Sequence, residues 1–135
     1  RLLVMGSVSV RLFASSTATD TDFTAKLVDV FPDGQALIVC EGIVRARYRN
    51  GLEKPELLQP GKTYAFDLRV GNTAVLFQVG HRIRLELSSS NFPRYDPNPN
   101  TGAEIATERN PLPATQAVFH TYEFPSALLL PVVPD

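Results

Sequence analysis

The chain has 135 residues, of which 44% are hydrophobic and 20% charged, and its 13 basic and 14 acidic residues leave a net charge of −1. This length suits one domain that buries a core without a disulfide or metal. The balanced charge excludes the long-range field that attracts nucleic acid, and no apolar run approaches the ~20 residues that span a bilayer. We therefore expect a soluble single domain over residues 1–135, with no nucleic-acid or membrane partner and no signal segment in this stretch. Cys40 is the lone cysteine, so the compartment stays unassigned.

The first half of the chain predicts a strand followed by a hairpin. Apolar and polar residues alternate over 8–12, as in a half-buried strand. The apolar parity changes within residues 23–31, which predicts a bulge or a strand end buried on both sides. Pro32-Asp33-Gly34 predicts a turn, and residues 37–48 predict the return strand, with a break near Gly42.

The middle of the chain predicts three further strands. Residues 62–70 predict the first, Gly71-Asn72 a turn, and residues 75–79 a short second strand. Gly80-His81 predicts another turn, and the regular alternation over 82–87 is the clearest strand pattern in the sequence.

The last third begins with an irregular region. Residues 91–102 contain three prolines and predict a long loop, whose length indicates a packing or binding role. Capping-box spacing predicts a single helical turn over 103–109, and residues 118–124 and 127–133 predict two closing strands. The 11 prolines and 8 glycines leave little room for longer helices, so the pattern favours an all-β sandwich or barrel.

Candidate catalytic motifs are incomplete. Ser88, Ser89 and Ser90 with two histidines supply the residue types of a Ser-His-Asp triad, but no G-x-S-x-G elbow is present. Residues 60–63 end like a phosphate-binding loop, but Glu56 stands where its first glycine belongs. We interpret the serines as a strand end and assign no catalytic residue.

Metal ligands are equally incomplete. Residues 96–102 resemble a calcium loop, but the glycine falls one place late and Thr107 stands at the position of the bidentate glutamate. An Asx-rich loop is favoured. Cys40, His81 and His120 lack the local spacing of a zinc site. We assign no metal and no cofactor.

Charged residues gather at two places. Arg45, Arg47 and Arg49 alternate on one strand face; a site for an acidic partner is one reading, and a solvated sheet face is the favoured one. Asp20 and Asp22 precede a strand and are expected to cap backbone amides.

Long blocks of this sequence resemble the C-terminal domain of the CocE/NonD hydrolases, which include cocaine esterase-like and glutaryl acylase-like enzymes and X-Pro dipeptidyl-peptidases. The likeness covers the chain from about Gly6 to Val133. The blocks that carry it are Ser15 to Val30, Pro32 to Gly34, Gly42 to Arg49, Leu58 to Gly61, Tyr64 to Leu68, Gly80 to Leu85, Ser88 to Asp96 and Asn98 to Gly102.

The resemblance implies a jelly-roll (galactose-binding-like) β-sandwich of about eight or more strands. In this family the nucleophilic serine and its partners belong to a preceding α/β-hydrolase domain with a helical cap. The chain is then a non-catalytic fragment of a longer hydrolase acting on acyl esters, amides or X-Pro dipeptides. It is expected to be inactive by itself, to pack on the catalytic and cap domains and to help wall the substrate pocket. Whether the parent is a homo-oligomer is left open.

The 91–102 loop offers a candidate interface. Phe92, Arg94, Tyr95 and Asp96 are expected either to dock on the catalytic domain or to close the rim of the sandwich. The alternative function is a carbohydrate-binding jelly-roll module, against which the absence of tryptophan counts.

Overall fold

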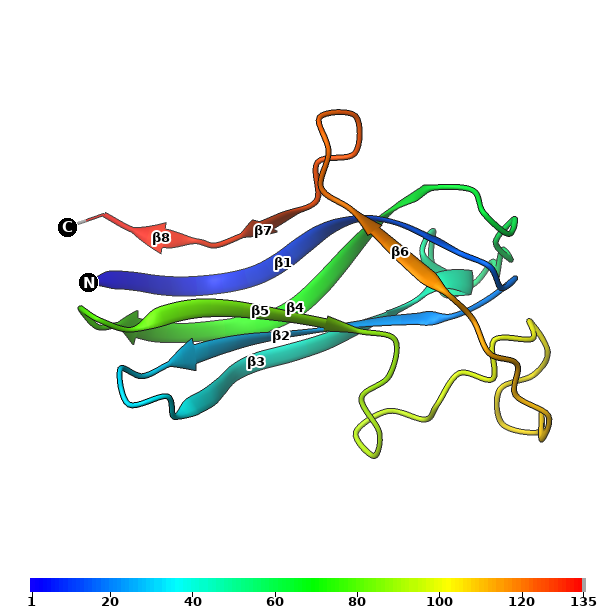
Figure 1. Ribbon diagram of the computed structural model, residues 1–135, viewed down its shortest axis with the longest axis horizontal. Coiled ribbons are helices and arrows are strands. Elements are labelled where there is room, and N and C mark those ends of the chain that lie inside the picture. Colours follow the sequence, from blue (N-terminus) through cyan, green and yellow to red (C-terminus); the bar gives the residue numbers. More distant parts are fainter. Residues whose placement is uncertain (135) are drawn as a thin grey trace.

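Two antiparallel sheets pack face to face in the computed structural model, which describes residues 1–134 (Figure 1). The elements are β1 (Leu2–Ser16), β2 (Asp22–Val30), β3 (Ala36–Arg45), the short 3-10 helix η1 (Ala46–Tyr48), β4 (Tyr64–Phe77), β5 (Arg82–Ser88), β6 (Gln116–Phe119), β7 (Ala127–Leu129) and β8 (Val132–Val133). Apart from η1, no helix occurs in this described part of the chain. The predicted all-β sandwich with about eight strands is confirmed.

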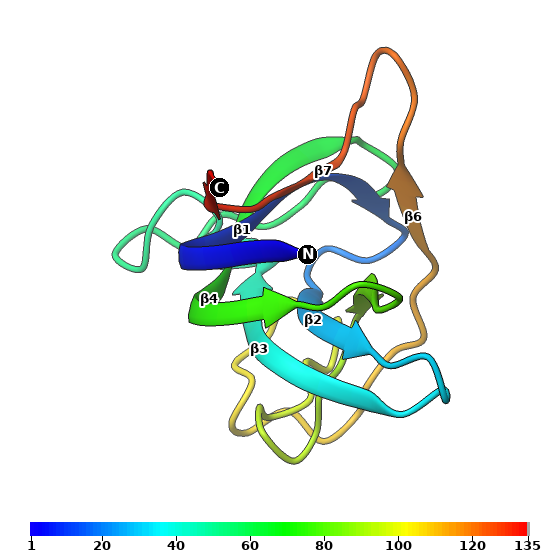
Figure 2. The ribbon, with the colours of Figure 1, turned by 90° about the vertical axis from the view of Figure 1, so that its left-hand side faces the viewer.

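The long strand β1 organises the larger sheet. β4 pairs with β1 along one side, while β6, β7 and β8 pair in turn with successive parts of its other side. The smaller sheet has the order β3-β2-β5. Viewed along the strands, Figure 2 shows β4 next to β3, with β6 on the opposite side of the molecule.

The core lies between the two sheets. Every second side chain of β1 and β4 points inward because neighbouring strand residues face opposite sides of a sheet. The rings of Phe23 and Phe66 meet across the core with centroids 5.0 Å apart. Burying an aliphatic side chain completely stabilises the fold by about 1.5–3 kcal/mol. The fully buried aliphatic residues include Val4, Val8, Val10, Leu12, Leu27, Leu68 and Val70.

The predicted turn at Gly71-Asn72 is wrong, because β4 runs through it as one strand. Gly71 has a φ of +149°, and the pairing register shifts opposite it, between Val8 and Ser9. A glycine with positive φ bends a paired strand at a bulge without ending it. Local sequence cannot separate this bulge from a turn, since both use the same residues.

The predicted break near Gly42 is wrong, because β3 runs through this residue. β3 continues to Arg45, where η1 replaces the last part of the predicted strand. A Cβ atom on Gly42 would overlap the backbone carbonyl of Arg69 in β4. The glycine therefore serves close contact between the sheets. Of the two alternatives predicted for residues 23–31, the strand buried on both sides is confirmed, because nearly all of β2 is buried. The bulge lies in β3, where Val39 is the extra residue opposite Leu27 and Val28.

The end of the chain is less regular than predicted. Residues 103–109 form one hydrogen-bonded turn, in which the Glu108 N–H donates to the Glu104 carbonyl, and no helix. β6 ends at Phe119, and the predicted strand over 127–133 is divided into β7 and β8.

The two ends of the sandwich differ. The termini and the β2–β3 and β4–β5 turns share one end, whereas the long connections over 46–63 and 89–115 occupy the other, called the loop end (Figure 1). Among the residues described, none belongs to a helix long and apolar enough to cross a membrane.

Candidate functional site

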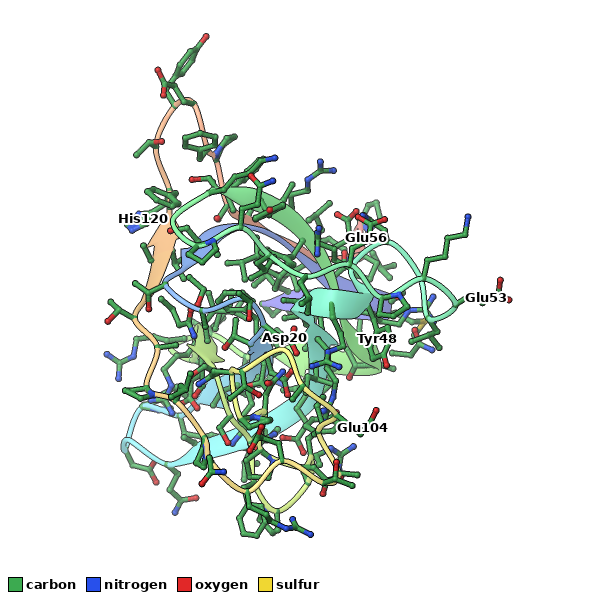
Figure 3. The ribbon with its side chains drawn as sticks, turned by 90° about the vertical axis from the view of Figure 1, so that its right-hand side faces the viewer. Asp20, Tyr48, Glu53, Glu56, Glu104 and His120 are labelled. Atoms are coloured by element: carbon green, nitrogen blue, oxygen red, sulfur yellow. The ribbon has the colours of Figure 1, made fainter. Side chains whose placement is uncertain are left out.

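A buried ion pair lies at the centre of the loop end. Asp20 is completely buried, and Arg47 is 8% exposed. Arg47 Nε donates to Asp20 Oδ2 at 2.8 Å, and the Arg47 backbone N–H donates to Asp20 Oδ1 at 3.0 Å. Figure 3 looks onto this end and places Asp20 near its middle, with Glu53 and Glu104 toward the margin. Satisfying both carboxylate oxygens offsets the cost of burying the charge.

Asn98 ties the 91–102 loop to this pair. Its Nδ2 atom donates to Asp20 Oδ2 and to Asp22 Oδ1, both at 2.9 Å. Two arginines hold the same loop by its backbone: Arg47 Nη2 donates to the Ala103 carbonyl at 2.7 Å, and Arg45 Nη2 donates to the Asp96 carbonyl at 3.1 Å. We call Asp20, Asp22, Arg45, Arg47 and Asn98 the buried polar cluster. The 91–102 loop forms no sheet hydrogen bonds, so the contacts from this cluster fix its path.

The carboxyl group of Asp22 has a displaced pKa. Burial raises the pKa of its carboxyl group from 3.8 to about 6, although the hydrogen bond from Asn98 and the charge of Arg45 act in the opposite direction. Desolvation disfavours the ionised form of a carboxyl group. Protonation of Asp22 therefore occurs within a mildly acidic pH range.

The four predicted interface residues lie on the outside of the anchored loop. Phe92 is 69% exposed, and Tyr95 is half-buried. Arg94 Nε lies 3.2 Å from Glu41 Oε1 on β3, and its guanidinium carbon lies 5.8 Å from the centroid of the Tyr95 ring. Asp96 is exposed. Arg94 and Tyr95 therefore lie against each other and Phe92 and Asp96 are exposed, while the interface role of the four residues stays a prediction.

The solvated-face interpretation of the three arginines is wrong. Arg47 pairs with Asp20, Arg45 Nε lies 3.8 Å from Asp22 Oδ2, and Arg49 Nη2 lies 3.5 Å from Glu56 Oε2. Sequence reasoning missed the Arg45 and Arg47 pairs because their carboxylate partners lie more than 20 positions earlier in the chain, Asp20 being 27 positions from Arg47. The predicted capping role is confirmed for Asp20, which accepts the Arg47 backbone N–H.

The two histidines considered as catalytic or metal-binding residues lie apart from the buried polar cluster. His81 Nδ1 lies 2.9 Å from Asp29 Oδ1, and the His81 ring contacts the Phe31 ring at a tilt of 46° with centroids 4.3 Å apart. His120 follows β6 and lines a hollow with Leu85 and Leu128, and Figure 3 shows it far to one side of Asp20. Within residues 1–134, no group of three or more His, Cys, Asp or Glu residues is arranged to hold a metal ion.

The two sides of the sandwich are closed to different degrees. On one side, the closed seam, β3 meets β4 so tightly that the space around Gly42 is filled by Arg69 and that around Gly71 by Cys40. On the other side, the open seam, β5 faces β6 and β7 across two hollows of ≈ 280 and ≈ 190 Å³. Both hollows are lined by Leu87 and Val118.

Comparison with known families identifies this sandwich. The family described as the X-Pro dipeptidyl-peptidase C-terminal non-catalytic domain matches residues 1–129. The chain belongs to this family. The resemblance to the C-terminal domain of CocE/NonD hydrolases is thereby confirmed.

Several relatives are much longer than this chain. It is 50% identical over 132 residues to the cocaine esterase of Rhodococcus sp. (strain MB1 Bresler), covering 96% of this chain and 23% of the esterase. It is 30% identical over 134 residues to a putative serine esterase of Mycobacterium bovis, covering 85% of this chain and 21% of that protein. The chain therefore spans about a quarter of these relatives or less.

Solved structures show the same fold. A crystal structure of an aminopeptidase from a marine sediment archaeon, Thaumarchaeota archaeon, matches 98% of this chain and 24% of its own with a TM-score of 0.94 and 32% identity. An alpha-amino acid ester hydrolase matches the same shares with a TM-score of 0.89 and 36% identity. A CocE/NonD family hydrolase from Staphylococcus aureus, at 15% identity and a TM-score of 0.80, shares the fold.

Proposed function

We propose that residues 1–135 form the C-terminal β-sandwich domain of a longer serine hydrolase acting on acyl esters, amides or X-Pro dipeptides. The observation that carries the proposal is the match of a non-catalytic C-terminal family over residues 1–129. Relatives named as esterases, an aminopeptidase and an ester hydrolase, each about four times as long, support it. The sandwich contributes no catalytic group and packs on the catalytic and cap domains, where it helps shape the substrate pocket.

The outer surface of the 91–102 loop is proposed as one part of that packing interface. Phe92 presents a large apolar side chain to solvent at 69% exposure. The buried polar cluster holds the loop through Asn98 and the Asp96 carbonyl, so little further ordering is needed on association. An anchored aromatic side chain loses little conformational entropy when a partner covers it. These properties suit Phe92 and its neighbours Arg94 and Tyr95 to docking.

The experiment uses a fluorophosphonate probe, which labels only an activated serine. We expect the protein encoded by the complete reading frame to be labelled at a serine in a G-x-S-x-G sequence preceding Arg1, and the polypeptide 1–135 to remain unlabelled. A complete reading frame without such a serine, or labelling of residues 1–135, contradicts the proposal. Binding of 1–135 to a glycan array at micromolar strength would favour the carbohydrate-binding alternative.

A further inference from the structure

The outer edge of β5 lacks two of the features that usually prevent an exposed strand from pairing, a proline and a bulge. β5 pairs with β2 in continuous register from Thr24 opposite Ser88 to Val30 opposite Arg82, and within residues 1–134 no strand pairs with its other edge. Exposed edges are normally blunted by charged side chains, prolines, bulges or inward-pointing charges. β5 has no proline and no register shift, and the side chains that it turns toward the core, Leu85 and Leu87, are apolar. Its charged residues, Arg82, Arg84 and Glu86, are exposed.

β3, the other edge of the smaller sheet, differs in this respect. Its pairing with β2 shifts register between Leu27 and Val28, so one residue of β3 is bulged. A bulge twists an edge away from further pairing. Of the two edges of this sheet, β5 is therefore the one suited to accept another strand.

The open seam beside β5 exposes apolar surface. The smaller hollow is lined chiefly by aliphatic side chains, whereas the larger one combines Phe23, Leu87 and Val118 with three polar residues. Val118 on β6 remains 39% exposed. Leu85, Leu87 and Leu128 pack against the core but stay only partly buried. The aliphatic residues along the seam are Val10, Leu85, Leu87, Val118, Ala127 and Leu128.

An unsatisfied polar atom lies at the same place. Gln116 lines the first hollow; its Nε2 atom donates to Thr21 Oγ1 at 2.7 Å, but its Oε1 atom is buried without a hydrogen-bond partner. A buried acceptor without a donor is costly. A backbone N–H group brought into the seam would meet this need after a small rotation of the Gln116 amide.

We propose that an extended segment of the parent polypeptide preceding Arg1 lies in the open seam and pairs with β5 as an additional strand. This inference rests on the proposed function. Because the family is a C-terminal domain and the matched part is 23% of the Rhodococcus relative, most of such a parent precedes this sandwich. Backbone hydrogen bonds to β5 provide affinity, and alternate apolar side chains fill the two hollows.

The test is hydrogen exchange measured by mass spectrometry on the complete parent protein. We expect the β5 amides that face away from β2 to be as protected as those of the central strand β2. Val118→Asp, which places a charge in the seam, should speed exchange over residues 82–88 by at least about tenfold by releasing the added strand.

Val133→Asp is the matched control. Val133 is the same residue type, is 38% exposed against 39% for Val118, and lies on a short strand that also pairs with β1, but it does not line either hollow. We expect this variant to leave exchange over residues 82–88 unchanged.

Unprotected outer amides of β5 in the wild-type parent overturn the inference, even if Val118→Asp does not fold. Equal effects of Val118→Asp and Val133→Asp on exchange over residues 82–88 also overturn it. If β5 is protected only when light scattering shows a dimer, the seam belongs to a second copy of the protein, and the inference is overturned as well. Fluorophosphonate labelling of the same wild-type sample reports separately on the proposed function. A protected β5 in an unlabelled protein refutes only the hydrolase, and a labelled protein with an unprotected β5 refutes only the added strand.

Discussion

The closed and open seams contain strands of the same character but end in different packing. β4 and β5 both alternate apolar and polar residues, and both are regular strands. At the closed seam, glycines let the backbones of β3 and β4 approach, and no room remains for a side chain at Gly42. At the open seam, Leu87 and Val118 border hollows. The difference shows that the alternation of apolar and polar residues in a strand does not determine how tightly the two sheets meet. The residues on the facing strand determine it.

The largest loss of stability is expected from a substitution at the closed seam. Gly42→Ala places a Cβ atom against the Arg69 carbonyl, so the sheets must separate. Overpacking of this kind lowers the free energy of unfolding by about 3 kcal/mol. Urea unfolding checks this value. Gly34→Ala serves as the control, because Gly34 has a φ of +92° but nothing within 4 Å of an added Cβ, so only backbone strain of about 1 kcal/mol is expected. Equal losses in the two variants would contradict the close approach.

The second largest effect is a pH dependence of stability. It arises at the loop end, where Asp22 pairs in register with Arg45 of β3, a strand of the closed seam. Because the pKa of Asp22 is raised from 3.8 to about 6, the folded protein holds this proton more tightly than the unfolded chain does. The resulting stability is present below about pH 4 and is lost as the pH rises to about 6.

Asp22→Asn removes this titration while keeping an oxygen that accepts from Asn98. Relative to the variant, the wild-type free energy of unfolding should fall by about 2 kcal/mol between pH 4 and pH 7. Denaturant titrations of both proteins across this range measure the difference. A constant difference between them would show that Asp22 does not titrate there.

A smaller loss of stability is expected for a leucine at the open seam than for a leucine in the core. Leu68 is completely buried, whereas Leu87 borders both hollows of the open seam. In the polypeptide 1–135, Leu87→Ala should lower the free energy of unfolding by about 1 kcal/mol, against about 3 kcal/mol for Leu68→Ala, because a half-exposed side chain loses fewer contacts. Chemical denaturation of the two variants provides the comparison. Losses of equal size would mean that the open seam is already packed as a core.

The smallest effect on stability is expected at the outer loop surface. Phe92→Ala should change the free energy of unfolding of residues 1–135 by less than about 0.5 kcal/mol, because the side chain is 69% exposed. In the complete parent protein, the same substitution together with Tyr95→Ala should weaken domain association and lower activity. Unchanged activity and association, with a less stable isolated sandwich, would assign the loop to the rim.

Local patterns were sufficient where a structural feature depends on neighbouring residues. The alternation over 82–87 predicted β5, the parity change over 23–31 predicted a strand buried on both sides, and Pro32-Asp33-Gly34 predicted the hairpin turn. Gly71 and Gly42 were misread, because a glycine that ends a strand and one that admits a neighbouring backbone look alike in sequence. Arg45 and Arg47 were misread because their carboxylate partners belong to a distant segment.

The sequence by itself determined the all-β class, the approximate number of strands and, through long blocks of likeness, the family. The all-β class and the number of strands follow from composition and side-chain periodicity, which are local properties, whereas the family rests on the sequence likeness. Tertiary structure alone decided that Asp20 and Arg47 form a buried pair, that Asn98 anchors the loop and that one seam is closed and the other open. These features depend on contacts between residues far apart in the chain, and such contacts are set by how the two sheets pack.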